Sequence, residues 1–344
     1  MRCPYCLEQV EAFLRDTQKG VSHCPQCRTM IPRAWLQGAQ DLRATVGVVG
    51  FSGHGKTVLL TSLFSTLKRF SEFWAGYYYR SLDDYTHRLI YEQVPLFEKG
   101  VLPTSTPANF PSPAMVHYHA LPVFGNAFIG YYDTAGEVFS DAAQIERAGF
   151  FVAHSDVVLF IISIPDCEPG QLDDEMSRLL DTYIRAAEDR LNADIRGKQR
   201  MVVIFTKADL MVDRLSPDLQ RWLADGSERW YAIEIHDKLM ALSLASLQIE
   251  EWLRDQMDCT RFPNMARDHF KEVRYTLVSA LGTNHSPDSG NPDPLRVLDP
   301  FFWMLVFTRD LEKPEAKQKM FDRLMNWLAG FRRKSAALPP DTSQ

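Results

Sequence analysis

The sequence has 344 residues, of which 45% are hydrophobic and 24% are charged. This composition is that of an ordinary globular protein with a sizeable core, and it excludes collagen-like and largely disordered chains. The net charge of -6 gives no overall electrostatic reason to bind nucleic acid or acidic membranes. No apolar run is long enough for a membrane span, and Met1 is followed by cysteines rather than a signal sequence, so we expect a cytoplasmic protein.

Four of the six cysteines cluster near the N-terminus. They form two Cys-x-x-Cys pairs, and the interval between the pairs is typical of a zinc site with four thiolate ligands. The predicted zinc ligands are Cys3, Cys6, Cys24 and Cys27. Disulfides are the alternative, but they would require an oxidising compartment. Cys167 and Cys259 stand apart, and we expect them to be packing residues.

The composition along the chain indicates five segments. Residues 28–43 contain polar residues and a lone tryptophan, Trp35, which predicts a linker or short helix with a domain boundary near residue 40. The last residues are polar and proline-rich, as is typical of disorder. We therefore assign residues 1–33 to a zinc ribbon, 34–44 to a linker, 45–312 to the main domain with helical insertions, 313–335 to a C-terminal amphipathic helix and 336–344 to a disordered tail.

Apolar runs predict the strands of the main domain. The predicted strands are residues 45–50, 115–124, 127–132, 157–163, 201–206 and 273–279. The nearly continuous apolar runs at 157–162 and 201–205 favour central strands covered on both faces. Gly125 and Asn126 favour the turn of an antiparallel hairpin. The predicted fold is α/β, with a mostly parallel, doubly wound sheet and one antiparallel edge strand.

Residues 50–57, Gly-Phe-Ser-Gly-His-Gly-Lys-Thr, satisfy the phosphate-loop pattern G-x-x-x-x-G-K-[ST] between a predicted strand and a predicted helix. In such a loop, backbone N–H groups and the helix N-terminus hold the phosphates, the lysine reaches the β- and γ-phosphates, and the hydroxyl ligates magnesium. The alternative is a glycine-rich turn with an accidental lysine. The predicted nucleotide ligands are Gly50, Ser52, Gly53, His54, Gly55, Lys56 and Thr57, with Lys56 also catalytic.

Residues 133–137, Asp-Thr-Ala-Gly-Glu, follow a predicted strand directly. The carboxyl ends of strands are where open α/β sheets bind ligands. We predict that Asp133 holds magnesium through water, and that the Gly136 N–H contacts the γ-phosphate. Taken alone, D-x-x-G is a common turn sequence. Its position after the phosphate loop makes it specific.

The base-recognition residues are predicted at the ends of two later strands. Asp209 follows residues 201–205, and a carboxylate there accepts hydrogen bonds from guanine N1–H and N2–H, a donor pair that adenine lacks. Lys207 would pack its stem over the base. A helix N-cap is the alternative role for Asp209. The predicted residues on the base side are Thr206, Lys207, Asp209, Ser279 and Ala280.

The segments GFSGHGKT, DTAGE, TKAD and SAL occur in this order, each after a predicted strand, and they resemble the first, third, fourth and fifth sequence elements of Ras-like P-loop GTPases. The resemblance covers about residues 45–312. It implies a GTP-dependent switch with slow hydrolysis, whose two states differ in loops near the γ-phosphate. The second element, a threonine that closes on magnesium, is expected within residues 102–107, with Thr104 preferred over Thr106.

Two residues depart from the Ras-like pattern. Ser52 replaces a glycine of the loop, and Glu137 stands where Ras proteins carry the glutamine that positions water. A carboxylate beside a γ-phosphate is repelled, yet it could orient or deprotonate water. We predict a catalytic, water-positioning role for Glu137. The alternative is an exposed glutamate at a helix N-terminus.

A Cys-x-x-Cys module joined to such a domain, with a helix-rich insertion around residues 221–257, resembles the prokaryotic double-GTPase family linked to biological conflict. The resemblance implies protein effectors or a partner GTPase. Packing is the expected role of the aromatic residues 73–79, and docking onto the core that of the C-terminal helix, with partner binding the alternative for both. The N-terminal module, residues 1–33, carries too small a positive excess to predict nucleic-acid binding.

These patterns predict a switch that binds GTP or GDP with Mg²⁺ and contains Zn²⁺. The main alternative is a non-hydrolysing scaffold, which nucleotide stabilises and which binds partners through the zinc ribbon and the C-terminal helix. An ATPase or kinase that shares only the phosphate loop is a third possibility, and Thr206 to Asp209 argue against it.

Overall fold

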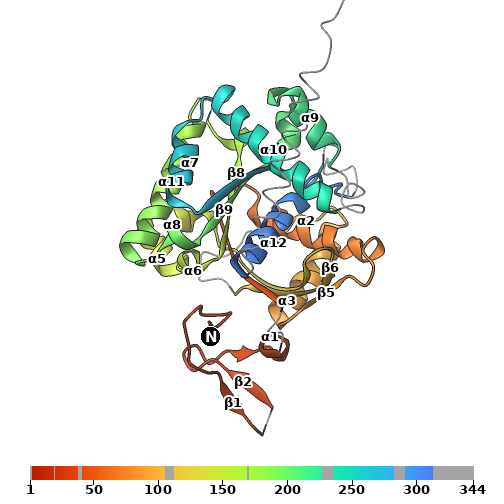
Figure 1. Cartoon of the computed structure of the whole chain (residues 1–344), viewed down its shortest axis with the longest axis vertical. Helices are drawn as coiled ribbons and strands as arrows, with labels where there is room; N and C mark the ends of the chain where they lie inside the picture. The colour runs from red at the N-terminus through yellow and green to blue at the C-terminus, as the bar shows by residue number, and fades with distance from the viewer. Residues whose placement is uncertain are drawn as a thin grey trace, which may run out of the picture.

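The computed structural model describes residues 2–18, 20–37, 41–104, 112–168, 170–226, 235–282 and 291–312. It contains a seven-stranded sheet covered by helices and, at one end of the molecule, a small sheet near the N-terminus (Figure 1). The predicted C-terminal helix and tail lie outside the described residues, as does Thr106. None of the helices in the described ranges is long and apolar enough to cross a membrane.

The large sheet has the strand order β10-β9-β8-β4-β7-β6-β5. Its strands are β4 (Leu42–Gly50), β5 (Tyr78–Ser81), β6 (Ala114–Leu121), β7 (Gly125–Tyr132), β8 (Val157–Ser163), β9 (Arg200–Thr206) and β10 (Glu272–Leu277). The strands from β10 to β7 are parallel, and β6 is antiparallel to both of its neighbours. β8 and β9 are buried along their whole length, as their continuous apolar runs predict. The α/β fold is therefore confirmed.

Three details of the sheet differ from the prediction. β4 begins at Leu42 rather than residue 45, because its first residues pair with β7. Gly125 and Asn126 belong to β7, and the hairpin turn lies before them, closed by a hydrogen bond from Phe124 N to Leu121 O (3.2 Å). The antiparallel strand β6 is not at the edge, because β5 pairs outside it. The four residues of β5 are Tyr-Tyr-Arg-Ser. They do not alternate between apolar and polar residues, so the sequence does not predict a strand there.

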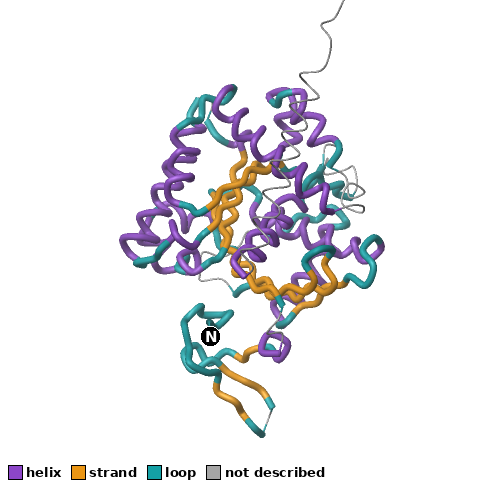
Figure 2. Tube along the Cα trace, viewed as in Figure 1, coloured by secondary structure: helices purple, strands orange, loops and turns teal. Residues whose placement is uncertain are grey.

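Helices cover both faces of the sheet, as a doubly wound fold requires (Figure 2). α2 (Lys56–Arg69) and α12 (Leu298–Glu312) pack against one face, and α5 (Ala142–Ala148), α7 (Leu172–Arg185) and α11 (Arg261–His269) against the other. α9 (Pro217–Ala224) and α10 (Ile235–Asp255) form the predicted helix-rich insertion. The shorter helices are α3 (Asp84–Arg88), α4 (Val94–Phe97), α6 (Phe151–His154), α8 (Ile195–Lys198), η1 (Phe70–Glu72), η2 (Leu89–Gln93), η3 (Gly136–Ser140), η4 (Ile164–Asp166), η5 (Ala186–Arg190) and η6 (Ala208–Arg214).

The N-terminal ribbon is a three-stranded antiparallel sheet of β1 (Leu14–Asp16), β2 (Val21–His23) and β3 (Met30–Ile31), followed by the short helix α1 (Arg33–Gln37). It packs directly on the main domain. Tyr132 donates a hydrogen bond to the Pro4 carbonyl oxygen, and Tyr5 donates one to Asp83 (3.1 Å). Leu7 is buried within the apolar core of the main domain. The ribbon and the main domain therefore share a core.

The isolated cysteines and the aromatic residues 73–79 act largely as packing residues. Cys259 is buried and Cys167 is half-buried in the core on the face of the sheet that α5, α7 and α11 cover. Trp74 and Tyr77 are buried in the core. Tyr78, in contrast, is 51% exposed on β5. Packing thus explains the centre of the aromatic segment but not its exposed margin.

Candidate nucleotide-binding site

The phosphate loop joins the end of β4 to the start of α2. Gly53 and Gly55 have φ angles of +79° and +83°, which residues with a side chain adopt only with strain. A Cβ atom on Gly50 would overlap the carbonyl oxygen of Ile161. The loop conformation therefore requires glycine at each of these positions.

Lys56 lies inside this loop and is only 6% exposed. Its Nζ donates hydrogen bonds to the carbonyl oxygens of Gly50 (3.1 Å) and Phe51 (2.9 Å). Burial lowers the pKa of Lys56, and the carboxylates of Asp133 and Glu137 act in the opposite direction. The ammonium group thus faces acidic residues from a different part of the chain.

Thr57 and Asp133 lie side by side although they are far apart in the sequence. Thr57, at the start of α2, donates a hydrogen bond from Oγ1 to Asp133 Oδ2 (2.9 Å). Asp133 follows β7 and Thr57 follows β4, and these two strands are parallel, so both residues lie beyond the carboxyl ends of the strands. A hydroxyl and a carboxylate are the hard oxygen donors that Mg²⁺ prefers. The donor set therefore fits the predicted magnesium site.

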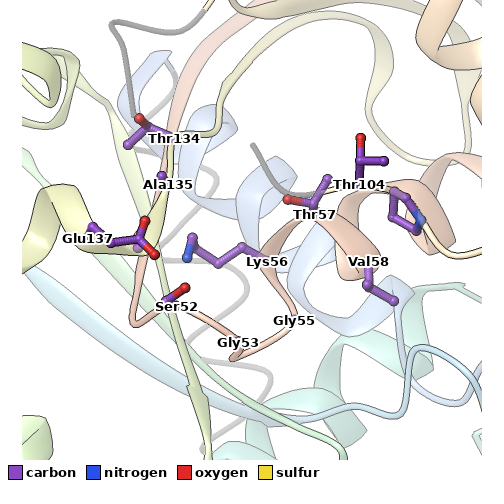
Figure 3. Close-up of a pocket in the computed structure, with 12 residues that line it drawn as sticks. Ser52, Gly53, Gly55, Lys56, Thr57, Val58, Thr104, Thr134, Ala135 and Glu137 are labelled. Carbon is purple, nitrogen blue, oxygen red and sulfur yellow. The ribbon is translucent and has the colours of Figure 1, made fainter. Parts of the chain in front are cut away.

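Gly136 and Glu137 contact the phosphate loop through η3. A Cβ atom on Gly136 would overlap the backbone nitrogen of Ser52, so only glycine fits. Glu137 is exposed, and a hydrogen bond with the Ser52 side chain is the main cause that lowers its pKa. Figure 3 shows Ser52, Lys56 and Glu137 pointing toward one another. The two departures from the Ras-like pattern are therefore in contact.

These elements surround an open cavity of about 380 Å³. Its described lining residues are Ser52, Gly53, Gly55, Lys56, Thr57, Val58, Pro103, Thr104, Thr134, Ala135, Gly136 and Glu137. Thr104, which we prefer as the threonine that closes on magnesium, therefore lines the cavity. His54 is not among these residues, because its ring turns away and its Nδ1 accepts a hydrogen bond from the Ser163 backbone N–H (3.1 Å).

The predicted base-side residues gather around the other side of the loop. Thr206 donates a hydrogen bond to the His54 carbonyl oxygen (2.8 Å). Lys207 donates one to the Gly53 carbonyl oxygen (3.2 Å), so its stem lies against the phosphate loop. Asp209 is half-exposed at the start of η6. The strand end at residue 206 is therefore tied to the phosphate loop at two points.

The loop after β10 lies next to these residues. The Ala208 N–H donates to the Val278 carbonyl oxygen (3.1 Å), and Ser279 Oγ accepts a hydrogen bond from the Gly282 N–H (2.9 Å). The Ala280 carbonyl oxygen accepts one from Ser62 of α2 (2.9 Å). The segments that carry Asp209 and Ser279 are thus neighbours, as a shared base site requires.

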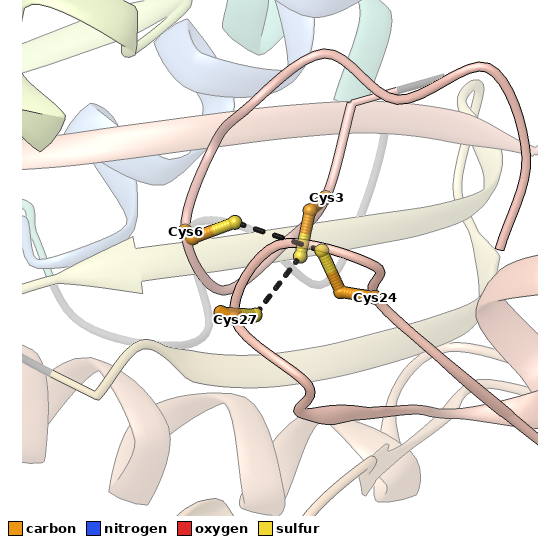
Figure 4. Close-up of side chains that lie close together, drawn as sticks. All are labelled: Cys3, Cys6, Cys24 and Cys27. Atoms are coloured by element: carbon orange, nitrogen blue, oxygen red, sulfur yellow. Dashed lines mark hydrogen bonds between the residues drawn. The ribbon is translucent and has the colours of Figure 1, made fainter. Parts of the chain in front are cut away.

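The four cysteines of the ribbon come together in space (Figure 4). Their sulfur atoms all lie within 4.8 Å of one another, and Cys3 to Cys27 and Cys6 to Cys24 are each 3.8 Å apart. Tetrahedral zinc with Zn–S bonds of about 2.3 Å separates its sulfur ligands by about 3.8 Å. The cysteines therefore fit a zinc ion, which would hold the two halves of the ribbon together.

A sequence model of the Double-GTPase 2 family matches residues 44–241, which is more than half of the chain. The protein belongs to the Double-GTPase 2 family. The match includes the phosphate loop, the DTAGE segment and the TKAD segment. The phosphate loop and the two segments that contact it, DTAGE and TKAD, therefore all lie inside the matched residues.

Comparisons with curated proteins and with solved structures do not change the family assignment. None of the curated proteins matches the sequence significantly. Among solved structures, the crystal structure of bacterial selenocysteine-specific elongation factor EF-Sec is similar with 12% sequence identity and a TM-score of 0.29, over 70% of this chain and 26% of that chain. The Double-GTPase 2 chain thus spans about a quarter of the length of that protein.

Two residues of this Double-GTPase 2 site are not predicted from the sequence. Asp166, at the end of η4, forms an ion pair of 2.5 Å with Lys207. Its position just after a predicted strand is the available signal, as for Asp209. Ser62 lies within α2, and no sequence pattern indicates that it reaches Ala280. Such contacts depend on how the helix packs against the sheet.

Proposed function

We propose that this protein binds GTP with Mg²⁺, hydrolyses it slowly and acts as a switch on protein partners. The observation that carries the proposal is the hydrogen bond between Thr57 and Asp133, next to Lys56 in a cavity bounded by the phosphate loop. A hydroxyl, a carboxylate and an ammonium group so arranged provide a magnesium site beside a triphosphate site.

The phosphate loop supplies the contacts that a triphosphate needs. Lys56 would exchange its two carbonyl acceptors for phosphate oxygens, which are charged and therefore stronger acceptors. Thr57, Asp133 and Thr104 are the proposed magnesium-side residues, and magnesium would neutralise charge on the phosphates. Gly136 packs against the backbone of Ser52 in the phosphate loop. A contact between the Gly136 N–H and the γ-phosphate would therefore couple the position of the DTAGE segment to the phosphate loop.

Asp209, Lys207, Thr206, Ser279 and Ala280 are the residues that we propose for guanine recognition. The support is their arrangement, because the loops after β9 and β10 are tied to each other and to the phosphate loop. Asp166 pairs with Lys207 and would position that side chain beside the base.

Hydrolysis is proposed to depend on Glu137. Its carboxylate faces the cavity and is held by Ser52, a geometry that suits the orientation of an attacking water. The same negative charge would repel the γ-phosphate, so turnover is expected to be slow. The proposed partners are protein effectors or a partner GTPase, in a bacterial conflict or defence system and in the cytoplasm, with the zinc ribbon as a contact surface.

A non-hydrolysing scaffold is the second candidate, and one observation favours it. The pKa of Glu137 is lowered rather than raised, mainly by the hydrogen bond with Ser52, so its carboxylate accepts a proton from water less readily than an ordinary glutamate does. In that case nucleotide would stabilise the fold, and the surfaces of the ribbon would bind partners without a cycle of hydrolysis.

Single-turnover hydrolysis separates the two functions. The full chain would be loaded with radiolabelled GTP, and phosphate release would be followed after addition of Mg²⁺. Release that stops in Glu137→Ala, while GTP remains bound, supports the switch. Tight GTP binding without magnesium-dependent phosphate release supports the scaffold. Tighter binding of ATP than of GTP would contradict the base assignment in either case.

A further inference from the structure

A groove of about 720 Å³ lies where the ribbon meets the edge of the large sheet. We call it the junction groove. Arg15 on β1, Arg33 on α1 and Arg80 on β5 line it, and all three side chains are exposed. Figure 1 shows α1 between the strands of the ribbon and the β5 side of the large sheet, at the end of the molecule that carries the N-terminus. Three separate elements thus direct positive charge to one place.

The charge of the junction groove is opposite to that of the whole protein. The net charge is -6, yet none of the described residues that line the groove is acidic. Asp16, the nearest carboxylate in sequence to Arg15, accepts a hydrogen bond from the Gln18 backbone N–H at the ribbon turn. No ion pair between described residues involves the three arginines. The groove therefore offers positive charge to an external acidic group.

The remaining surface of the groove is mostly apolar. Its apolar lining residues are Val21, Met30, Ile31, Pro32, Ala34, Leu36 and Leu82. None of the described lining residues is aromatic, whereas proteins that bind single-stranded nucleic acid stack bases on aromatic side chains. An apolar floor with arginines at its rim instead suits a polypeptide that carries both acidic and apolar side chains.

Two strand edges border the groove. β3 is the last strand of the ribbon sheet, and β5 is the last strand of the large sheet. Met30 and Ile31 of β3, and Arg80 and Ser81 of β5, all line the groove. An exposed strand edge presents backbone N–H and C=O groups that pair with an extended peptide, and alternate side chains of that peptide then face the same way.

A second cavity of about 540 Å³ continues the groove along the ribbon. The two share Met30, Pro32 and Leu82. The second cavity is acidic, since Asp83 and Asp84 line it. Because like charges repel, the acidic residues of a bound segment are expected in the junction groove and not in the second cavity.

We propose that the junction groove binds an extended segment of a partner protein in which acidic and apolar residues alternate. The inference rests on the proposed function in one respect, namely that the protein acts through protein partners. The arginines recognise the carboxylates, the apolar floor receives the alternate side chains, and β3 or β5 pairs with the backbone.

A peptide-display experiment tests this proposal. A phage library of short random peptides is selected on the full chain loaded with zinc and GDP. The enriched peptides are synthesised with a fluorescent label and titrated against the wild type and against Arg15→Glu/Arg33→Glu/Arg80→Glu. The matched control is Arg147→Glu/Arg196→Glu/Lys271→Glu, which changes the net charge equally with exposed residues elsewhere. Labelled GDP is titrated against every variant.

We expect enrichment of Asp or Glu alternating with apolar residues, at least tenfold weaker binding to the groove variant, and unchanged binding to the control. Peptides without acidic bias, or equal binding to both variants, would overturn the proposal. Tighter binding of labelled oligothymidine in the groove than of any peptide would also overturn it. If the groove variant loses GDP binding, the single variants Arg33→Ala and Arg80→Ala replace it. If the wild type does not bind GDP, the proposed nucleotide-binding function is refuted, while the proposal for the junction groove is still decided by the peptide titrations.

Discussion

The Ser52 hydroxyl donates a hydrogen bond to the Glu137 carboxylate, although the two residues are far apart in the sequence. Ser52 belongs to the phosphate loop and Glu137 to the segment after β7. Each replaces a residue of the Ras-like pattern, and their contact indicates that the two replacements act as a pair. The serine holds the carboxylate, which a glycine could not do.

We expect Glu137→Ala to slow single-turnover GTP hydrolysis by about 10- to 100-fold, because a positioned general base contributes on the order of 100-fold or more. GTP affinity should stay the same or increase, since a negative charge beside the γ-phosphate is removed. Ser52→Ala should have a smaller effect, because the carboxylate remains. The control is Glu251→Ala, which alters an exposed glutamate of α10. An unchanged rate in Glu137→Ala would exclude the water-positioning role.

Thr57→Ala should reduce the contribution of magnesium to nucleotide affinity. The variant removes a hydroxyl that lies 2.9 Å from Asp133 Oδ2, so one of the proposed oxygen donors is lost. We expect affinity for labelled GDP to fall by about tenfold or more with Mg²⁺ and to change little in excess EDTA, since losing a charge-assisted contact costs about 1.5 kcal/mol or more. The control is Thr182→Ala, which removes the hydroxyl of a helical threonine in α7. Equal losses with and without Mg²⁺ would contradict the assignment.

Asp209→Asn should change which base is bound. A carboxylate accepts hydrogen bonds from the N1–H and N2–H groups of guanine, whereas an amide also donates one and so suits the C2 carbonyl group of xanthine. Competition against labelled GDP should show that GTP binds on the order of 100-fold more weakly and that xanthosine triphosphate binds more tightly than to the wild type. Asp213→Asn in the same helix is the control. Unaltered preference for GTP would place the base elsewhere.

His54 should make stability depend on pH. Burial lowers the pKa of His54 to about 4, and Nδ1 accepts a hydrogen bond from Ser163. An imidazole in the unfolded chain titrates near 6.5, so between these values the unfolded chain binds a proton that the folded protein does not. The free energy of unfolding should therefore fall as the pH decreases from about 6.5 to about 4, by about 3 kcal/mol at most, with no contribution above this range.

Urea unfolding of wild type and His54→Gln across this pH range measures the contribution of His54. The difference in free energy of unfolding between the two proteins should shrink as the pH falls, because the variant lacks the imidazole that titrates. His87→Gln, at an exposed position, should parallel the wild type. A constant difference between wild type and His54→Gln would show that the imidazole does not resist protonation.

Cys24→Ser should remove zinc and destabilise the whole protein. The buried Cys24 lies 3.8 Å from Cys6, and Leu7 of the ribbon is part of the main-domain core. We expect about one zinc per chain in the wild type and a small fraction of that in the variant, together with a lower Tm. Cys167→Ser should retain zinc. Metal content by mass spectrometry checks the first point, and a full zinc complement in Cys24→Ser would refute the site.

Some parts of the candidate nucleotide site can be predicted from the sequence, and others cannot. The turn of the phosphate loop is predictable, because Gly53, Gly55 and Lys56 are local requirements of one turn. Thr104 lines the cavity, but Thr106 lies outside the described residues, so the choice between the two threonines stays a prediction. Asp166 is missed, because its role depends on a lysine in another loop. β5 is missed because its residues 78–81 are half exposed and make sense as a strand only beside β6.

The sequence by itself determined the order of strand, loop and helix, the four clustered cysteines and the residue types that suit a nucleotide. These depend on short-range geometry, in which a few neighbouring residues fix the backbone. Only the tertiary structure brought Ser52 to Glu137, joined the ribbon to the core through Tyr132, and opened a groove between β3 and β5. Such contacts link distant segments, and packing of the whole chain decides them because many pairings satisfy the same local pattern.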